Sequence, residues 1–129
     1  MSGTCPFCSP RNNRIILETE LVVGLWDGYP VSSGHALVVP RRHVETWFEL
    51  SADEQAAMIS TIDEVRARIE KEHSPDAYNI GVNSGRAAGQ TVPHAHVHVI
   101  PRYEGDVDDP RGGVRWVIPD KAAYWSDSG

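Results

Sequence analysis

The chain has 129 residues, of which 40% are hydrophobic, and a formal net charge of −6 at pH 7. This length suits one hydrophobic core, so we expect residues 1–129 to form a single domain. The acidic balance argues against a nucleic-acid partner, although a local basic pocket can still hold one small phosphorylated ligand. No apolar run reaches the roughly 20 residues that cross a bilayer, and residues 1–10 lack the pattern of a signal peptide. We therefore expect a soluble, cytoplasmic protein with no membrane partner.

The two cysteines of the chain, Cys5 and Cys8, stand in the motif Cys-Pro-Phe-Cys near the N-terminus. In the cytosol this spacing favours thiol, metal or redox chemistry over a structural disulfide. Two thiolates do not complete a tetrahedral zinc site, which needs two more ligands, for which histidines are the usual choice. From the spacing alone, zinc binding and a redox or incidental role are equally favoured.

The first third of the chain predicts three strands. Residues 14–19 and 21–27 are rich in Ile, Leu and Val, and the short break between them permits antiparallel pairing as a hairpin. After a turn rich in glycine, proline and serine, residues 35–40 predict a third strand that ends at Pro40.

A helix follows residue 51. Ser51 and Glu54 have the spacing of a capping box, and an apolar residue then recurs every three or four positions from Met58 to Ile69. The pair Ser74-Pro75 predicts the end of this helix.

The second half of the chain predicts two further strands. Residues 78–83 and 94–100 have strand-like composition, and the loop 84–93 joins them. The tail beyond residue 102 has little periodicity, so we expect an irregular segment that wraps either the core or a partner subunit.

Three histidines alternate with small apolar residues in the fifth predicted strand: His94, His96 and His98. The two-residue period of a strand places the imidazoles on one face and the apolar side chains on the other. One interpretation is a polar strand face exposed to solvent. Another is a metal site, because His96, His98 and Glu104 come near the spacing of a cupin-type site, although the strands are few for a cupin barrel.

The third interpretation is nucleophilic catalysis. A neutral imidazole can attack phosphorus through one nitrogen while the other donates a hydrogen bond that fixes the tautomer. The unperturbed pKa of histidine, about 6.5, leaves a usable neutral fraction near pH 7. Neighbouring imidazoles can then bind phosphate oxygens or pass a proton to the leaving group.

The segment from Gln90 to Arg102, Gln-Thr-Val-Pro-His-Ala-His-Val-His-Val-Ile-Pro-Arg, resembles the signature of the histidine triad (HIT) superfamily. Asp27, the run 35–40, His43 and Asn83 also fall where that family places its ligand-binding and core segments. The resemblance covers nearly the whole chain up to Arg102, and it points to bacterial-type members related to dinucleoside polyphosphate hydrolases. It implies an α+β fold, with an antiparallel sheet of about five strands and one main helix, assembled as a homodimer.

The resemblance also implies catalytic roles for matching residues. His96 would be the nucleophile, His98 would lie on the phosphate, and His35 would complete the imidazole cluster. His98 favours hydrolysis, because transferase and phosphorylase branches commonly carry glutamine at that position.

Substrate-binding roles follow in the same way. Asn83 and Gln90 would hold phosphate oxygens, and Asp27 would bind the ribose hydroxyls, with ordinary turn chemistry before Gly28 as the alternative. The glycine of the loop permits close backbone approach, and the residues after it can cradle an anion. The segment concerned is Gly89, Gln90 and Thr91.

Relatives with an N-terminal Cys-x-x-Cys bind zinc through it, together with two histidines. The matching positions here are Cys5, Cys8, His43 and His94. Two sulfurs and two nitrogens form a closed tetrahedral set, which suits a structural ion and leaves the other triad histidines free for chemistry. No catalytic metal is implied.

The implied function is hydrolysis at the α-phosphate of dinucleoside polyphosphates or nucleoside phosphoramidates. The reaction would pass through a nucleotidyl-histidine and release a nucleoside monophosphate, with adenine as the base that the family leads us to expect. Two other classes stay open: a nucleotide-binding regulatory module with little turnover, and a cupin-like metal enzyme that uses the triad as ligands.

Overall fold

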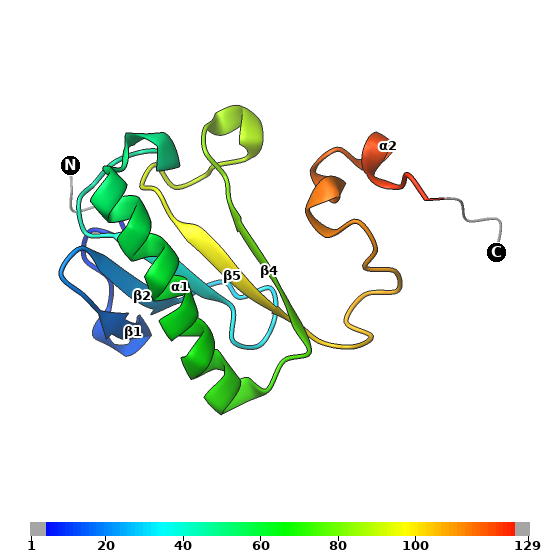
Figure 1. The fold of residues 1–129 in the computed structure, drawn as a ribbon, viewed down its shortest axis with the longest axis horizontal. Coiled ribbons are helices and arrows are strands. Elements are labelled where there is room, and N and C mark those ends of the chain that lie inside the picture. Colours follow the sequence, from blue (N-terminus) through cyan, green and yellow to red (C-terminus); the bar gives the residue numbers. More distant parts are fainter. Residues whose placement is uncertain (1–4, 126–129) are drawn as a thin grey trace.

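A computed structural model describes residues 5–125 of the chain. Its five strands form one antiparallel sheet in the order β1-β2-β3-β5-β4. The strands are β1 (Ile15–Glu18), β2 (Val22–Trp26), β3 (Ala36–Pro40), β4 (Ala77–Val82) and β5 (Val97–Arg102). One long helix, α1 (Ala52–His73), lies across one face of the sheet (Figure 1). The predicted α+β fold, with five strands and one main helix, is confirmed.

Helix α1 begins where its capping box predicts. The Ser51 side chain accepts a hydrogen bond from the Glu54 N–H, and the Glu54 carboxylate accepts one from the Ser51 N–H. Glu54 is buried and also forms a two-pronged ion pair with Arg42, which lowers the pKa of this carboxyl to about 2. The helix ends at Ser74, whose φ of 53° lies in the left-handed region.

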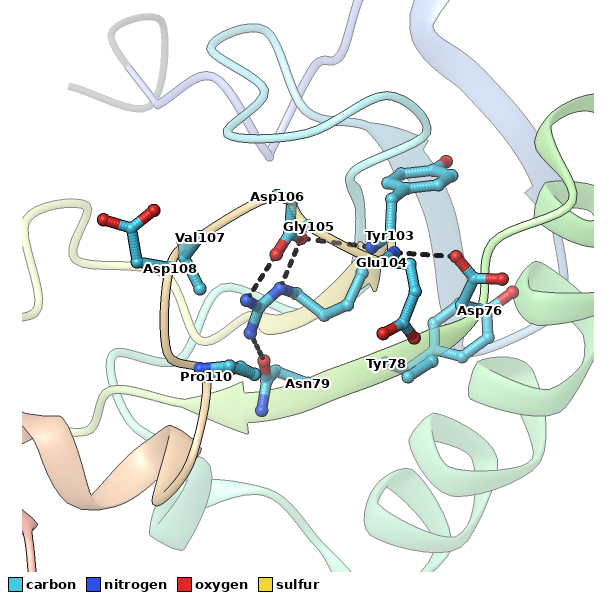
Figure 2. Close-up of a pocket in the computed structure, with 12 residues that line it drawn as sticks. Asp76, Tyr78, Asn79, Tyr103, Glu104, Gly105, Asp106, Val107, Asp108 and Pro110 are labelled. Carbon is cyan, nitrogen blue, oxygen red and sulfur yellow. Dashed lines mark hydrogen bonds and ion pairs between the residues drawn. The ribbon is translucent and has the colours of Figure 1, made fainter. Parts of the chain in front are cut away.

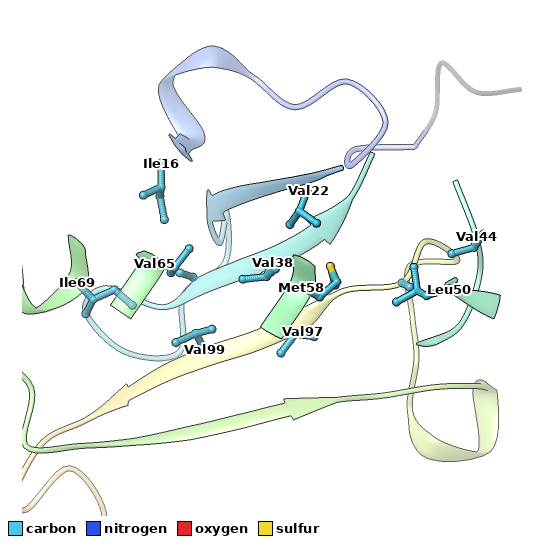
Figure 3. Close-up of a cluster of buried hydrophobic side chains, with 12 residues drawn as sticks. Ile16, Val22, Val38, Val44, Leu50, Met58, Val65, Ile69, Val97 and Val99 are labelled. Atoms are coloured by element: carbon cyan, nitrogen blue, oxygen red, sulfur yellow. The ribbon is translucent and has the colours of Figure 1, made fainter. Parts of the chain in front are cut away.

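The main core lies between α1 and the sheet (Figure 3). Met58, Val65 and Ile69 on the helix are fully buried, as their spacing predicts. The helix approaches β2 so closely that a Cβ on Gly24 would lie 2.7 Å from a methyl carbon of Val65. Glycine is therefore required at this position by packing.

A second apolar cluster covers the opposite face of the sheet. It consists of Phe7 with alternate residues of β2 and β3: Val23, Leu25, Leu37 and Val39. Because successive side chains of a strand point to opposite faces, β2 and β3 are buried on both sides. The N-terminal segment thereby packs on the face that α1 leaves open.

The first four strands end within one residue of the predicted bounds, but β5 begins at Val97 rather than at residue 94. The prediction that one strand carries all three imidazoles is therefore wrong. His94 and His96 precede the strand, because the backbone there makes other bonds: the His94 N–H donates to Val92 O, and the Ala95 N–H donates to Val44 O. Only His98 lies in the sheet.

The tail runs from the end of β5 past the edge strand β4 and carries two short helices, η5 (Gly113–Val117) and α2 (Pro119–Ala122) (Figure 1). It is held largely by its own contacts, such as the Trp116 Nε1–H donating to Arg111 O. Within residues 5–125, no helix is long and apolar enough to cross a membrane. A single domain spanning 1–129 stays a prediction, since residues 1–4 and 126–129 lie outside the described part.

Candidate active site and metal centre

The side chain of His96 is held in one orientation by the backbone two residues earlier. Its Nδ1 lies 2.8 Å from the carbonyl oxygen of His94, so Nδ1 carries a proton and donates it. The other nitrogen, Nε2, is then left with a free electron pair. The residue is 6% exposed and lines a cavity, and because Nδ1 is bonded to the His94 carbonyl, Nε2 is the nitrogen left to act on a ligand there.

His98 is oriented by a chain of hydrogen bonds through His35. The Val31 N–H donates to His35 Nδ1 at 3.1 Å, which places the His35 proton on Nε2. That nitrogen lies 3.0 Å from His98 Nδ1 and 3.3 Å from Asp27 Oδ2. His98 Nδ1 therefore accepts, and the proton of neutral His98 is on Nε2, where it can be donated to a ligand.

Burial keeps the rings of His35 and His98 neutral. It lowers the pKa of His98 to about 4. The nearby rings of His96 and His35 lower this pKa further, whereas the negative charge of Asp27 raises it. Burial also lowers the pKa of His35, again against Asp27. The imidazole that lies 3.3 Å from Asp27 is thus neutral near pH 7, so the contact between Asp27 and His35 is not an ion pair at that pH.

These residues line one cavity of about 300 Å³ on the face of the sheet opposite α1. His96, His98, His35 and Asp27 form its polar wall together with Asn83, Thr91 and Arg14. Its apolar wall is made of Pro6, Phe7, Leu37, Val31 and Val92, and Tyr29 stands at the side. Most of the residues predicted for catalysis and substrate binding are thus brought together.

Gly89 and Gln90 are the predicted site residues that do not line this cavity. The Gln90 side chain instead binds backbone: its amide NH₂ donates to Glu45 O and Val92 O, and its carbonyl oxygen accepts from the Gly85 N–H. Gly89 has a φ of 95°, a conformation that favours glycine. Both residues shape the loop that presents Thr91 to the cavity.

A second histidine group lies beside the first. His94 is fully buried, and its Nε2–H donates to Pro40 O at 2.9 Å, so its Nδ1 has a free electron pair. That Nδ1 lies 3.4 Å from Cys5 Sγ, 3.7 Å from Cys8 Sγ and 3.1 Å from His43 Nδ1. His43 Nδ1 is also 3.1 Å from Cys8 Sγ. All four predicted metal ligands therefore converge on one point.

This group fits a tetrahedral metal ion. Bonds of about 2.0–2.3 Å to zinc put neighbouring nitrogen and sulfur ligands roughly 3.3–3.8 Å apart, close to the separations observed. The hydrogen bond from His94 to Pro40 supplies the outer-shell partner that fixes a metal-ligating tautomer. Burial and the neighbouring Cys5 raise the pKa of the Cys8 thiol, a shift that a bound cation would oppose.

The two histidine groups share a wall. The ring of Phe7, between the two cysteines in sequence, lies edge-on to His94 at 5.9 Å and tilted against His96 at 5.0 Å between centroids. His94 contributes its side chain to the Cys/His group and its carbonyl oxygen to His96. The position of the His96 ring therefore depends on the segment that carries the cysteines.

Glu104 lies elsewhere, which removes the basis of the cupin-like alternative. It is on the loop after β5, where its N–H donates to Asp76 Oδ2 (Figure 2). This loop borders a cavity of about 410 Å³. The guanidinium of Arg102, which lines the cavity, donates hydrogen bonds to Asp106 and Asn79. The sheet is moreover open, with β1 and β4 at its edges, rather than a closed barrel.

Comparison with known proteins agrees with this geometry. The family model described as the HIT domain matches residues 10–105, about three quarters of the chain. The chain belongs to the HIT family.

HIT relatives of several kinds are similar to it. An uncharacterised HIT-like protein of Methanocaldococcus jannaschii is 41% identical over 79% of this chain and 81% of its own length. The asymmetrical bis(5′-nucleosyl)-tetraphosphatase of Schizosaccharomyces pombe is 37% identical over 78% of this chain. The match spans 55% of that enzyme, so the chain corresponds to about half of its length.

Solved structures of HIT proteins share the fold. A histidine triad nucleotide-binding protein from Sulfolobus tokodaii has a TM-score of 0.73 and 38% identity, covering 79% of this chain and 71% of that one. A zinc-bound histidine triad family protein from Mycobacterium smegmatis has a TM-score of 0.73 and 29% identity, covering 100% of this chain and 86% of that one.

Proposed function

We propose that the chain is a nucleotidyl hydrolase that cleaves at the α-phosphate of dinucleoside polyphosphates or nucleoside phosphoramidates. The observation that carries the proposal is the pair of opposite tautomers in one cavity. His96 offers an electron pair on Nε2, and His98 offers a proton on Nε2. A nucleophile and a hydrogen-bond donor side by side suit substitution at a phosphorus atom. The family supports it, since the fission yeast relative is named as a tetraphosphatase.

The reaction has two steps. In the first, the His96 Nε2 electron pair forms a bond to the α-phosphorus, and the bond from phosphorus to the leaving group breaks with its electrons. In the second, a water oxygen replaces Nε2, releasing the nucleoside monophosphate and a proton. Each barrier is lower than that of a single displacement. His98, Asn83 and Thr91 would bind the phosphate oxygens, because all three line the cavity with His96.

We propose zinc as the ion held by Cys5, Cys8, His43 and His94. The donor set of two thiolates and two imidazoles supports this, and so does the zinc-bound relative. A bound ion would cross-link the N-terminal segment to the residues that precede β5. His94 would then hold its carbonyl oxygen steady against His96. The thiols are free of disulfide bonds, the form that binds metal and persists in the cytoplasm, which we propose as the location.

A homodimer is part of the proposal. Apolar side chains are exposed along the edge strand and the tail beside it: Ile80, Val82, Val114, Val117 and Ile118. An edge strand with exposed apolar residues is suited to pairing with another chain.

The test is the release of nucleoside monophosphate by wild type and by His96→Ala. Substrates are a fluorogenic adenosine phosphoramidate and diadenosine polyphosphates, with adenine chosen because the family resemblance favours it. We expect a burst followed by turnover from wild type and neither from the variant, whose zinc content should match wild type. Equal activity in the variant would overturn the proposal. Tight binding of nucleotide with no cleavage would instead identify a regulatory binding module.

A further inference from the structure

Arg14 lies on the wall of the catalytic cavity and takes no part in the proposed two-step reaction. It precedes β1 and is the only Lys or Arg among the described residues that line this cavity. Its Nε–H donates to Trp26 O at 3.0 Å, which fixes the root of the guanidinium. Within residues 5–125, its two terminal NH₂ groups have no hydrogen-bond partner and no ion pair.

The neighbouring backbone leaves room for this guanidinium. A Cβ on Gly28 would lie 3.1 Å from both the Cζ and an Nη atom of Arg14, tighter than ordinary van der Waals contact. Any larger residue at position 28 would press on the guanidinium. The Arg14 guanidinium is therefore hydrogen-bonded to Trp26 O and packs against Gly28, where the absence of a side chain leaves room for it.

Arg14 lies away from the imidazoles that act on the phosphate. Its head is bound to Trp26 O at the end of β2, His98 is on β5, and the sheet order separates these two strands by two steps. With about 4.8 Å between neighbouring strands, the two positions are about 10 Å apart across the sheet. His35, just before β3, lies between them.

The wall between these two positions suits a flat base better than a second phosphate. Phe7, Leu37 and Val31 contribute apolar surface there. A polyphosphate chain would lose hydration against such a wall, whereas a nucleobase has apolar faces and polar edges. With the α-phosphate at His96, the base would lie over these side chains and turn an edge towards Arg14.

The free end of Arg14 is chemically selective for one purine edge. Its two NH₂ groups only donate hydrogen bonds. Guanine presents two acceptors, O6 and N7, side by side, whereas adenine presents N7 next to an amino group that is itself a donor. We propose that Arg14 recognises the base and that the protein prefers guanine over adenine nucleotides, against the adenine that the family resemblance leads us to expect.

This inference rests on the proposed hydrolase function, and its test compares bases and leaving groups together. Wild type, Arg14→Met and Arg14→Lys are each assayed for kcat/KM on guanosine and adenosine phosphoramidates with the same uncharged amine, and on the diguanosine and diadenosine polyphosphates. We expect wild type to favour guanosine about tenfold. Arg14→Met should reduce the preference to within twofold, because kcat/KM should fall for the guanosine substrates and stay the same for the adenosine substrates. Arg14→Lys should also lose it, because lysine keeps the charge but not the two-pronged donor.

A matched control is Arg41→Met. Arg41 also donates its Nε–H to a backbone carbonyl, that of Thr19, but lies outside this cavity. We expect its guanosine preference to equal that of wild type. Gly28→Ala, which crowds the Arg14 head without changing its charge, should weaken the preference.

Each other outcome contradicts the inference in a distinct way. An equal loss of kcat/KM on guanosine and adenosine substrates in Arg14→Met would mean that Arg14 only stacks on the base. A loss confined to polyphosphate substrates, or full rescue by lysine, would place Arg14 on the phosphates of the leaving group. An unchanged preference in Arg14→Met would exclude any role in base recognition. If wild type cleaves none of the four substrates, the hydrolase proposal fails first.

Discussion

Two imidazole clusters lie next to each other, and each has a donor set that can hold a metal: Cys5, Cys8, His43 and His94 in one, and Asp27, His35 and His98 in the other. They differ in what faces each nitrogen. In the cysteine cluster, the Nδ1 atoms of His43 and His94 point at each other and at two sulfurs. In the aspartate cluster, a donor faces an acceptor at each step from Val31 N–H through His35 to His98, and Asp27 Oδ2 lies 3.3 Å from His35 Nε2.

We propose that this difference separates metal-binding histidines from a catalytic one. Two imidazole nitrogens and two sulfurs around one point form a donor set that a cation would satisfy together, which supports the metal site proposed for the first cluster. The second cluster is satisfied by its own hydrogen bonds and leaves the His98 proton facing the cavity. On this proposal the hydrogen-bond partners of each histidine decide which of the two roles it takes.

The largest effect should come from breaking the cysteine cluster. We expect Cys8→Ser to lose its zinc and to melt about 15 °C lower, since a tightly bound ion contributes about 4 kcal/mol at 1,000 times its Kd. Zinc is measured by elemental analysis and melting by calorimetry. The control is His98→Ala, which should keep its zinc. Zinc retained in Cys8→Ser and lost from His98→Ala would assign the metal to the aspartate cluster instead.

The next largest effect should come from removing the proton donor. His98→Ala should lower kcat about 100-fold with little change in KM, because its N–H acts on the phosphate mainly as charge develops in the transition state. His98→Gln, which restores an N–H, should recover part of the loss. Steady-state kinetics on a phosphoramidate tests both. A rise in KM with kcat unchanged would show that His98 only binds substrate.

The sequence predicts every residue of both clusters. Cys5 and Cys8 form a recognisable motif by themselves, whereas the other members are assigned through the family resemblance: His43, His94, Asp27, His35 and His98. The capping box at Ser51 and the periods of the strands likewise fix most of the fold, because they are local patterns. The start of β5 is not predicted, since it depends on the distant contact between Ala95 N–H and Val44 O.

Contacts across the sheet hide other site residues from the sequence. Arg14 and Phe7 reach the cavity only because β1 to β3 fold beneath it, and neither stands in the triad signature. Gln90 does stand in the signature, yet its amide is used by the loop backbone. A basic residue just before an apolar strand is a weak signal that does not identify a ligand contact.

Stability should depend on pH through the aspartate cluster. The pKa of His98 is about 4 in the folded chain and about 6.5 when unfolded, so between these values the unfolded state binds more protons. The free energy of unfolding should then fall as the pH is lowered from 6.5 towards 4, by at most about 1.4 kcal/mol per pH unit from this group. Denaturant titrations at pH 7, 5.5 and 4.5 measure it. His98→Ala should show a shallower decline; an identical decline would remove His98 as its source.

The smallest effect should come from Phe7, the side chain that contacts both His94 of the cysteine cluster and the proposed nucleophile His96. Phe7→Leu removes ring contacts with His94 and His96 but keeps apolar volume, so we expect a loss of about 1 kcal/mol and a few-fold lower kcat with zinc retained. Elemental analysis, denaturant titration and kinetics on one preparation test this. Unchanged kcat despite lower stability would show that His96 does not depend on Phe7 for its position.

Catalysis by His96 is tested most sharply by trapping the nucleotidyl enzyme. Wild type is mixed with excess nucleoside phosphoramidate, quenched during the burst under conditions that preserve phosphorus–nitrogen bonds, and digested for mass spectrometry. We predict one nucleoside monophosphate group on His96, absent from His96→Ala. An adduct on another residue, or a burst with no adduct, would contradict His96 as the nucleophile.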